Sequence, residues 1–282
     1  MNYSFEIKET IIRALNEDVK TGDITTEAIF TNNEIGKAKL IAKDSGILAG
    51  IEIFELTFKL VDNNIKVGTF KKDGEIIRKG DTIATLEGSI SSILIAERTA
   101  LNFLQRMSGI ATTTNIFVDK TKHTKAKILD TRKTVPGLRL LDKMAVKIGG
   151  GENHRIGLYD MFLIKDNHIA GAGSITKAVE KVIEYKKKNN LNALIEIEVK
   201  NFDELNEAMS LPVDIIMLDN FSIANLKKAV EIVQNKFKLE ASGGINMNTL
   251  VEVAETGVDY ISIGALTHSV KAMDISLRIE QI

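Results

Sequence analysis

The sequence contains no cysteine and only two prolines, Pro136 and Pro212, among its 282 residues. The absence of cysteine excludes disulfides and thiolate metal sites, and the scarcity of proline leaves no proline-rich linker. The formal net charge is −1, so no overall basic balance indicates nucleic acid or an anionic membrane as a partner. Charged residues interrupt the N-terminal segment, and no later run is long and apolar enough to span a bilayer. We therefore expect a soluble, cytoplasmic protein.

Apolar residues make up 44% of the chain, enough to bury a large core in one big domain or two unequal ones. Residues 4–18 are predicted to form an amphipathic helix, followed by short β-type runs around 37–43, 65–72 and 82–86. A second helix is predicted over residues 91–107. Its apolar positions cover more than one face, which is typical of a helix buried against a second domain or subunit.

The stretch Gly74–Gly88 resembles part of the barrel-sandwich hairpin of biotinyl and lipoyl carrier domains. A swinging-arm carrier would need a lysine at a Met-Lys-Met-like hairpin tip, and none is present there. We therefore interpret this stretch as part of a structural sandwich.

From about residue 125 the pattern changes to short apolar strands that each end in polar residues. Six are recognisable, with helical segments between several of them: AKILDTRK, MFLIKDNH, LIEIEVK, DIIMLDN, LEASGG and YISIGAL. Their spacing is typical of βα units in a parallel barrel, although eight would be needed to complete one. The predicted class is α/β. A sandwich-like α/β domain at residues 1–110 precedes an incomplete (βα) barrel at 111–269, and a tail at 270–282 is expected to pack back on the first domain.

Cationic side chains follow the first two barrel strands. In a parallel barrel the carboxyl ends of the strands converge, so these side chains should share one mouth: Arg132, Lys133, His154, Arg155 and Lys165. Cations gathered in one cavity repel one another unless a polyanion neutralises them. Arginine suits a carboxylate through its planar fork, and lysine suits a phosphate as a compact charge. The mouth therefore predicts substrates that carry carboxylates and phosphates. His168 is expected instead to make a structural hydrogen bond at a strand end.

The later strand ends carry glycines and carboxylates. The segments ASGGI and SIGAL leave room for backbone N–H groups, a common phosphate site after the last strands of a barrel, although they could simply make tight turns. Glu198 and Asp219 could reach hydroxyl groups or a divalent ion. Because all these ligands are oxygen atoms, Mg²⁺ is favoured over zinc, although the carboxylates could merely balance charge.

These residues closely resemble those of the quinolinate phosphoribosyltransferase family. The resemblance runs almost the whole length of the chain, and its most specific part is the order DTRKTVPGLR, GGGENHR and IKDNH. It implies a homodimer, or a hexamer built of dimers, in which Arg98 is donated to the neighbouring active site. It assigns substrate binding to Arg132, Lys133, Arg155 and Lys165, and it places Glu198 and Asp219 near the ribose and the metal. Thr131 and His154, which lie beside these cations in the sequence, are also expected to contact substrate. The resemblance assigns phosphate binding to Ser242, Gly243, Gly244, Ile263, Gly264 and Ala265.

The resemblance also implies a reaction. Quinolinate and phosphoribosyl pyrophosphate (PRPP) would give nicotinate mononucleotide, carbon dioxide and pyrophosphate in NAD biosynthesis. Lys133, Lys165, Glu198 and Asp219 would be the catalytic residues, with Mg²⁺ as cofactor near Glu198 and Asp219. No nucleic acid or membrane partner is expected.

Three other functions stay open at this point. Lys165 ends a barrel strand, where the imine-forming lysine of a Schiff-base aldolase could lie. A related phosphoribosyltransferase could use another acceptor, although it would not need every arginine present here. A non-catalytic carrier or scaffold could be built on the sandwich domain, but this would leave the cationic mouth unexplained.

Overall fold

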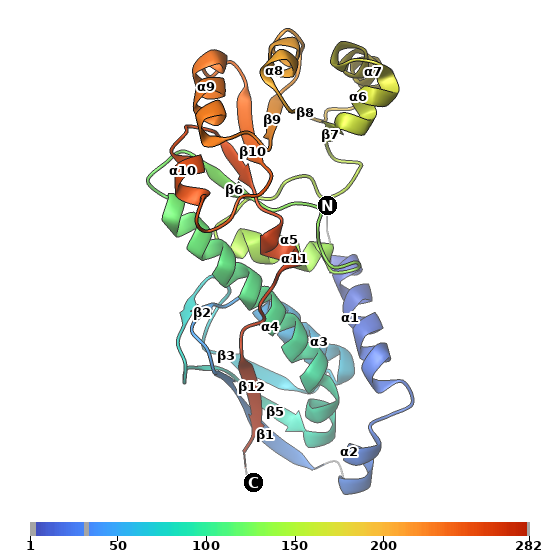
Figure 1. Cartoon of the computed structure of the whole chain (residues 1–282). Helices are drawn as coiled ribbons and strands as arrows, with labels where there is room; N and C mark the ends of the chain where they lie inside the picture. The colour runs from blue at the N-terminus through green and yellow to red at the C-terminus, as the bar shows by residue number, and fades with distance from the viewer. Residues whose placement is uncertain (1–3, 31–33, 281–282) are drawn as a thin grey trace. The chain divides into compact units, whose positions relative to one another are not determined.

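In the computed structural model, which describes residues 4–30 and 34–280, the chain divides into two units (Figure 1). The first unit comprises Met1–Asn115, Thr134–Gly150 and Leu266–Ile282, and the second comprises Ile116–Lys133 and Gly151–Ala265. The units therefore do not follow the boundary placed at residue 110, because Thr134–Gly150 groups with the first unit. The predicted domain limits stay a prediction.

Apolar and polar residues alternate along β1 (Ile35–Ala42), so that one face of this strand is buried. The strand lies inside a four-stranded sheet with the order β12-β1-β5-β3, in which all pairs are antiparallel. The other strands are β12 (Ile275–Ile279), β5 (Thr82–Ser89) and β3 (Lys66–Thr69), and a separate pair is formed by β2 (Gly46–Ile47) and β4 (Ile76–Ile77). The C-terminal segment thus completes the N-terminal sheet.

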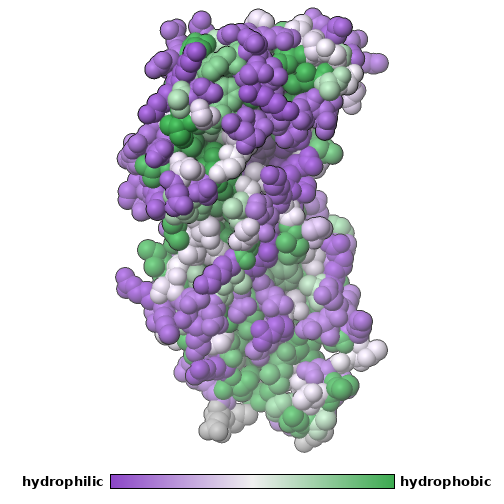
Figure 2. All heavy atoms as spheres, viewed as in Figure 1, coloured by the Kyte–Doolittle hydropathy of each residue, from purple (hydrophilic) through white to green (hydrophobic). Residues whose placement is uncertain are grey.

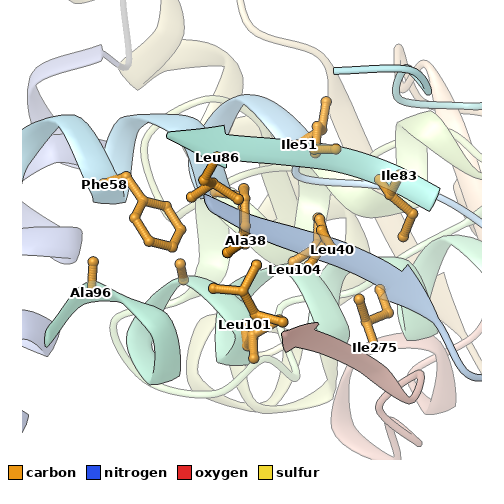
Figure 3. Close-up of a cluster of buried hydrophobic side chains, with 14 of the residues drawn as sticks. Ala38, Leu40, Ile51, Phe58, Ile83, Leu86, Ala96, Leu101, Leu104 and Ile275 are labelled. Carbon is orange, nitrogen blue, oxygen red and sulfur yellow. The ribbon is translucent and has the colours of Figure 1, made fainter. Parts of the chain in front are cut away.

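Helices α3 (Ile51–Val61) and α4 (Ile90–Thr121) pack on the buried face of this sheet, and α4 continues into the second unit. The first unit also contains α1 (Ser4–Val19), α2 (Ile24–Ile29) and α5 (Arg139–Ile148). Figure 3 shows how the core is built: Leu40 of β1 and Leu86 of β5 face Leu101 of α4, with Phe58 of α3 beside them. These four side chains are 1% exposed or less.

The second unit is a parallel α/β structure. Its six strands have the order β6-β11-β10-β9-β8-β7 and are all parallel to their neighbours. Their bounds are β6 (Lys127–Leu129), β7 (Phe162–Ile164), β8 (Ile195–Val199), β9 (Ile215–Asp219), β10 (Lys238–Ser242) and β11 (Tyr260–Ser262). Each lies in one of the six segments predicted to be strands. The predicted combination of a sandwich-like domain and an incomplete barrel is confirmed.

The helices between these strands are α6 (Asp166–Ala172), α7 (Ile175–Lys188), α8 (Phe202–Met209), α9 (Ile223–Val233) and α10 (Leu250–Ala254), followed by α11 (Ala265–His268). The predicted N-caps are confirmed, because Ser174 accepts a hydrogen bond from the backbone of Lys177 and Ser222 from that of Asn225. In the sheet order, β6 and β7 are the two edges. Leu129, the last residue of β6, also forms an isolated parallel bridge with Glu152.

Candidate active site

The carboxyl ends of the parallel strands place most of the predicted site residues at one edge of the second unit. Thr131, Arg132 and Lys133 follow β6, Lys165 follows β7, Glu198 lies in β8, and Asp219 ends β9. Ser242 ends β10, and its neighbours Gly243 and Gly244 follow. Ile263, Gly264 and Ala265 come directly after β11. Arg98 lies on α4 in the first unit, where its side chain is exposed.

Lys165 and Glu198 form an ion pair, with 2.8 Å between Lys165 Nζ and Glu198 Oε2. Lys165 occupies the N-cap of α6, and its backbone N–H donates to His168 Nδ1 over 2.9 Å, which fixes the strand end. The structural role predicted for His168 is confirmed. A lysine that forms an imine must have its Nζ available to attack a carbonyl, whereas Lys165 Nζ is engaged by a carboxylate. The ion pair therefore disfavours the aldolase alternative.

Arg155 is held in place but has an unused donor. Its Nη1 donates to the carbonyl of Met161 over 3.2 Å, while its Nε is buried and has no hydrogen-bond partner among the described residues. Burial lowers the pKa of Arg155, and the nearby charge of Arg132 lowers it further. Two guanidinium groups in mutual repulsion, one with a buried unpaired donor, form a site that a bound anion would stabilise.

The cations from separate segments share one electrostatic environment. Arg132 acts on Arg155, and the buried carboxyl of Glu196 lies within reach of both Arg155 and Lys165. Residues separated by 23 to 41 positions in sequence are thus brought together, as the convergence of strand ends predicts. The side chain of Lys133 is exposed, and its backbone N–H donates to Thr131 Oγ1 over 3.0 Å.

The turn that carries His154 and Arg155 is fixed by two aspartates. Asp130 is fully buried, and its Oδ1 accepts from the backbone N–H of His154 over 2.9 Å. Asp160 accepts from the backbone N–H groups of Ile156, over 2.7 Å, and of Gly157, over 2.9 Å. Arg155 therefore lies between two anchored points and does not depend on a loose glycine-rich loop.

Beneath the mouth, three ionisable side chains meet in the barrel interior. His154 Nε2 lies 2.9 Å from Glu196 Oε2 and 3.5 Å from Glu240 Oε2, and both glutamates are fully buried. Burial raises the pKa of Glu196 to about 7 and that of Glu240 to about 8, the latter also because Glu196 is near. His154 Nδ1 accepts from the backbone N–H of Arg155 over 2.9 Å. Both ring nitrogens thus contact protein groups, and the predicted contact of His154 with substrate stays a prediction.

The glycines after β10 have a steric role next to Asp219. Gly243 has a φ of +97°, and a Cβ atom there would lie 2.2 Å from Asn220 Oδ1. Asn220 itself has a φ of +56°, donates from Nδ2 to Asp219 Oδ2 over 2.9 Å, and donates from its backbone to the carbonyl of Ser242 over 2.9 Å. A Cβ at Gly244 would meet nothing within 4 Å. The space beside Gly243 is therefore filled by Asn220, whereas the backbone at Gly244 is open enough for a phosphate to approach.

Sequence reasoning did not identify three residues that shape this site: Asp130, Glu196 and Glu240 were not assigned a role. One signal was available for Glu240, because a charged residue inside an apolar run of a parallel strand is costly unless it has a partner. The identity of that partner is a property of the fold, since His154 is far away in sequence.

Known proteins resemble this chain over almost its whole length. The family model "Quinolinate phosphoribosyl transferase, N-terminal domain" matches residues 23–108, and the corresponding C-terminal model matches residues 110–278. A relative from Nicotiana tabacum named quinolinate phosphoribosyltransferase (decarboxylating) 2b, mitochondrial, is 44% identical, covering 98% of this chain and 83% of the relative. A Bacillus subtilis relative named probable nicotinate-nucleotide pyrophosphorylase (carboxylating) is 43% identical, covering 98% and 94% respectively.

A solved structure gives the same result. The nicotinate-nucleotide pyrophosphorylase from Ehrlichia chaffeensis superposes with a TM-score of 0.92 at 46% identity, covering 99% of this chain and 100% of that protein. The agreement therefore extends over both units of the chain.

Proposed function

Because the chain belongs to the quinolinate phosphoribosyltransferase family, we propose that it transfers the phosphoribosyl group of PRPP to quinolinate with decarboxylation. The products are nicotinate mononucleotide, carbon dioxide and pyrophosphate, in the biosynthesis of NAD. The observation that carries this proposal is the group of cations at the strand ends, above all the buried unpaired Nε of Arg155 beside Arg132. Such a group suits a substrate with two adjacent carboxylates.

In this proposal some of the cations bind quinolinate and others bind PRPP. Arg132, Arg155 and Lys165 hold the ring carboxylates of quinolinate, with Thr131 and His154 in the same wall, while Arg98 of a second copy completes the site. Lys133, exposed at the end of β6, faces the pyrophosphate of PRPP. The 5-phosphate lies on the backbone of the two glycine-containing strand ends, formed by Ser242, Gly243, Gly244, Ile263, Gly264 and Ala265.

Glu198 and Asp219 are the proposed carboxylates near the ribose and the metal. Each has one oxygen already engaged, Glu198 Oε2 by Lys165 and Asp219 Oδ2 by Asn220. The second oxygen of each carboxylate fits an oxygen-preferring ion such as Mg²⁺, which takes one or two carboxylates together with substrate phosphates. When bound, the ion would neutralise charge on the pyrophosphate leaving group.

The chemistry needs positioning more than covalent catalysis. The C1–oxygen bond of the ribose breaks, with its electron pair leaving on pyrophosphate, and the pyridine nitrogen forms the new bond to C1. Glu198 and Asp219 stabilise the positive charge that develops on the ribose. The bond from C2 of the ring to its carboxylate then breaks, its electrons stay on the cationic ring, and C2 takes up a proton as carbon dioxide departs. Aligning the two anionic substrates supplies most of the rate enhancement.

We further propose a homodimer, or a hexamer of dimers, in which Arg98 acts across the interface. The first unit exposes large apolar side chains that an interface would bury, among them Phe5, Ile24 and Ile29. Figure 2 shows hydrophobic residues at the surface in the lower part of the view, where Figure 1 draws β1, β5 and α2. Mixing inactive Arg98→Ala and Lys165→Ala proteins tests this idea, because activity returns only if one site can combine residues from two chains.

A cytoplasmic location is also proposed, and cell fractionation followed by immunoblotting tests it. Within the described part of the chain, no helix is long and apolar enough to cross a membrane.

The decisive assay mixes the protein with quinolinate, PRPP and Mg²⁺ and measures carbon dioxide and nicotinate mononucleotide. Nicotinic acid serves as the control acceptor, because it has one ring carboxylate fewer. Turnover with quinolinate alone supports the proposal, whereas turnover with nicotinic acid alone would favour a related transferase. Absence of turnover with either acceptor would contradict the proposal.

A further inference from the structure

Two glutamates and a histidine lie in the barrel interior, below the residues to which the reaction has been assigned. Glu196 comes from β8 and Glu240 from β10, two strands separated by β9. Alternate strands of a barrel contribute side chains to the same interior layer, which explains why the two carboxyl groups meet. Both are fully buried, and burying an acid is costly unless its partners compensate. A pure packing position would be better filled by an apolar residue.

The hydrogen bonds of His154 connect this cluster to the mouth. Its Nδ1 accepts the backbone N–H of Arg155 over 2.9 Å, so the ring proton belongs on Nε2. Nε2 lies 2.9 Å from Glu196 Oε2 and 3.5 Å from Glu240 Oε2. Contacts therefore run from the Arg155 backbone through the imidazole to Glu196 and Glu240.

The groups around each glutamate show which of the two reaches Arg155. Glu196 faces Glu240, Arg155, Lys165 and Glu198, while Glu240 faces Glu196, His154 and the Ser262 hydroxyl. Glu196 is therefore the member of the pair that acts on Arg155 directly, and its attraction for the guanidinium opposes the repulsion from Arg132.

We propose that Glu196, Glu240 and His154 are positioning residues that hold Arg155 in the orientation in which it binds a carboxylate of the substrate. The inference rests on the proposed function, because it takes quinolinate as the ligand of Arg155. Its consequence is selective: the network acts on the affinity for the dicarboxylate and leaves PRPP binding, which uses other strand ends, nearly unchanged.

The test measures both Michaelis constants for Glu196→Gln. The variant keeps the shape of the side chain but removes its charge, and the KM for quinolinate should rise about tenfold while the KM for PRPP changes less than about threefold. Glu255→Gln is the matched control, because Glu255 also contacts a histidine, His123, at 3.2 Å, but on the exposed surface. An unchanged KM for quinolinate in Glu196→Gln, with active wild-type enzyme, overturns the inference alone. If the wild-type protein itself has no activity, the result contradicts the proposed function and not this inference alone.

A second variant covers the case in which Glu196→Gln does not fold. Glu240→Gln removes the other acid that meets Glu196, and it should raise the KM for quinolinate about three- to tenfold while the KM for PRPP changes little. An unchanged KM for quinolinate in Glu240→Gln, with the melting temperature of the wild type, overturns the inference. A stoichiometric metal ion that wild-type enzyme holds and Glu240→Gln loses also overturns it, in favour of a metal centre formed by the same three side chains.

Discussion

Replacing Arg155 by alanine removes a guanidinium that is half-buried, fixed to the Met161 carbonyl and unpaired at Nε. By analogy with other lost charge-assisted donors, this should cost about 2–4 kcal/mol of transition-state stabilisation. At 1.36 kcal/mol for each factor of ten, kcat/KM for quinolinate should fall roughly 30- to 900-fold. The lower half of that range is expected, because the substitution also relieves the repulsion between Arg155 and Arg132 that lowers the pKa of Arg155.

Steady-state kinetics with varied quinolinate and saturating PRPP measure this effect. Arg155→Lys keeps the charge without the planar fork and should fall between wild type and Arg155→Ala. Lys238→Ala is the control, because Lys238 is the first residue of β10, at the amino end of the parallel strands and away from the site, where its exposed side chain pairs with Asp259 at 2.8 Å. An Arg155→Ala enzyme with undiminished kcat/KM would refute the assignment of this cation to the substrate.

Three further predictions concern the phosphate loop, the buried acids and the metal. Gly243→Ala should lose about 1–3 kcal/mol of stability and raise the KM for PRPP, because its φ is +97° and its Cβ would collide with Asn220. Gly244→Ala should be milder, since its Cβ would meet nothing within 4 Å, and equal melting temperatures would contradict this. Because the pKa of Glu240 is raised to about 8 in the folded protein, the free energy of unfolding of the wild type should fall as pH rises from about 5 to 8. Glu240→Gln lacks this titration, so the difference between its free energy of unfolding and that of the wild type should change in its favour by up to about 1.4 kcal/mol per pH unit. A pH-independent difference in unfolding free energy would exclude that titration. Chelation by EDTA should abolish turnover, and added Mg²⁺ should restore it. Full activity in EDTA would contradict the proposal that the reaction needs a metal ion.

The barrel strands could be predicted from sequence because each is a short apolar run with polar residues at its carboxyl end. The first unit was harder. Helix α3, whose sequence IEIFELTFKLV alternates like a strand, received no prediction, and its helical state depends on burial of Phe54 and Phe58 in the core. Helix α4 extends beyond the predicted end at Met107 to Thr121. It continues through Gly109, where a Cβ would lie 2.2 Å from the Lys271 carbonyl, so a contact distant in sequence explains why glycine is present there.

In the site, too, the positions of residues could be predicted from local sequence, whereas roles that depend on contacts distant in sequence could not. Positions such as Arg132 and Lys165 follow recognisable strands, and the convergence of parallel strand ends is enough to predict that they share a mouth. The roles of Asp130 and Glu240 could not be predicted in this way, because they depend on the partner that each side chain meets. Asp130 anchors a turn 24 residues away, through His154, and Glu240 meets a glutamate from a strand that is not its neighbour.

The strand IEIEV shows how depth along one strand determines the chemistry of an acid. Glu196 and Glu198 are two residues apart and therefore project from the same face of β8. Glu198, nearer the carboxyl end, reaches Lys165 at the mouth, where a charged carboxylate can act on a substrate. Glu196, one layer deeper, has its pKa raised to about 7 by burial and can share a proton with Glu240. Two glutamates of identical chemistry thus lie in different environments, which is why we propose that Glu198 faces the reaction and Glu196 supports Arg155.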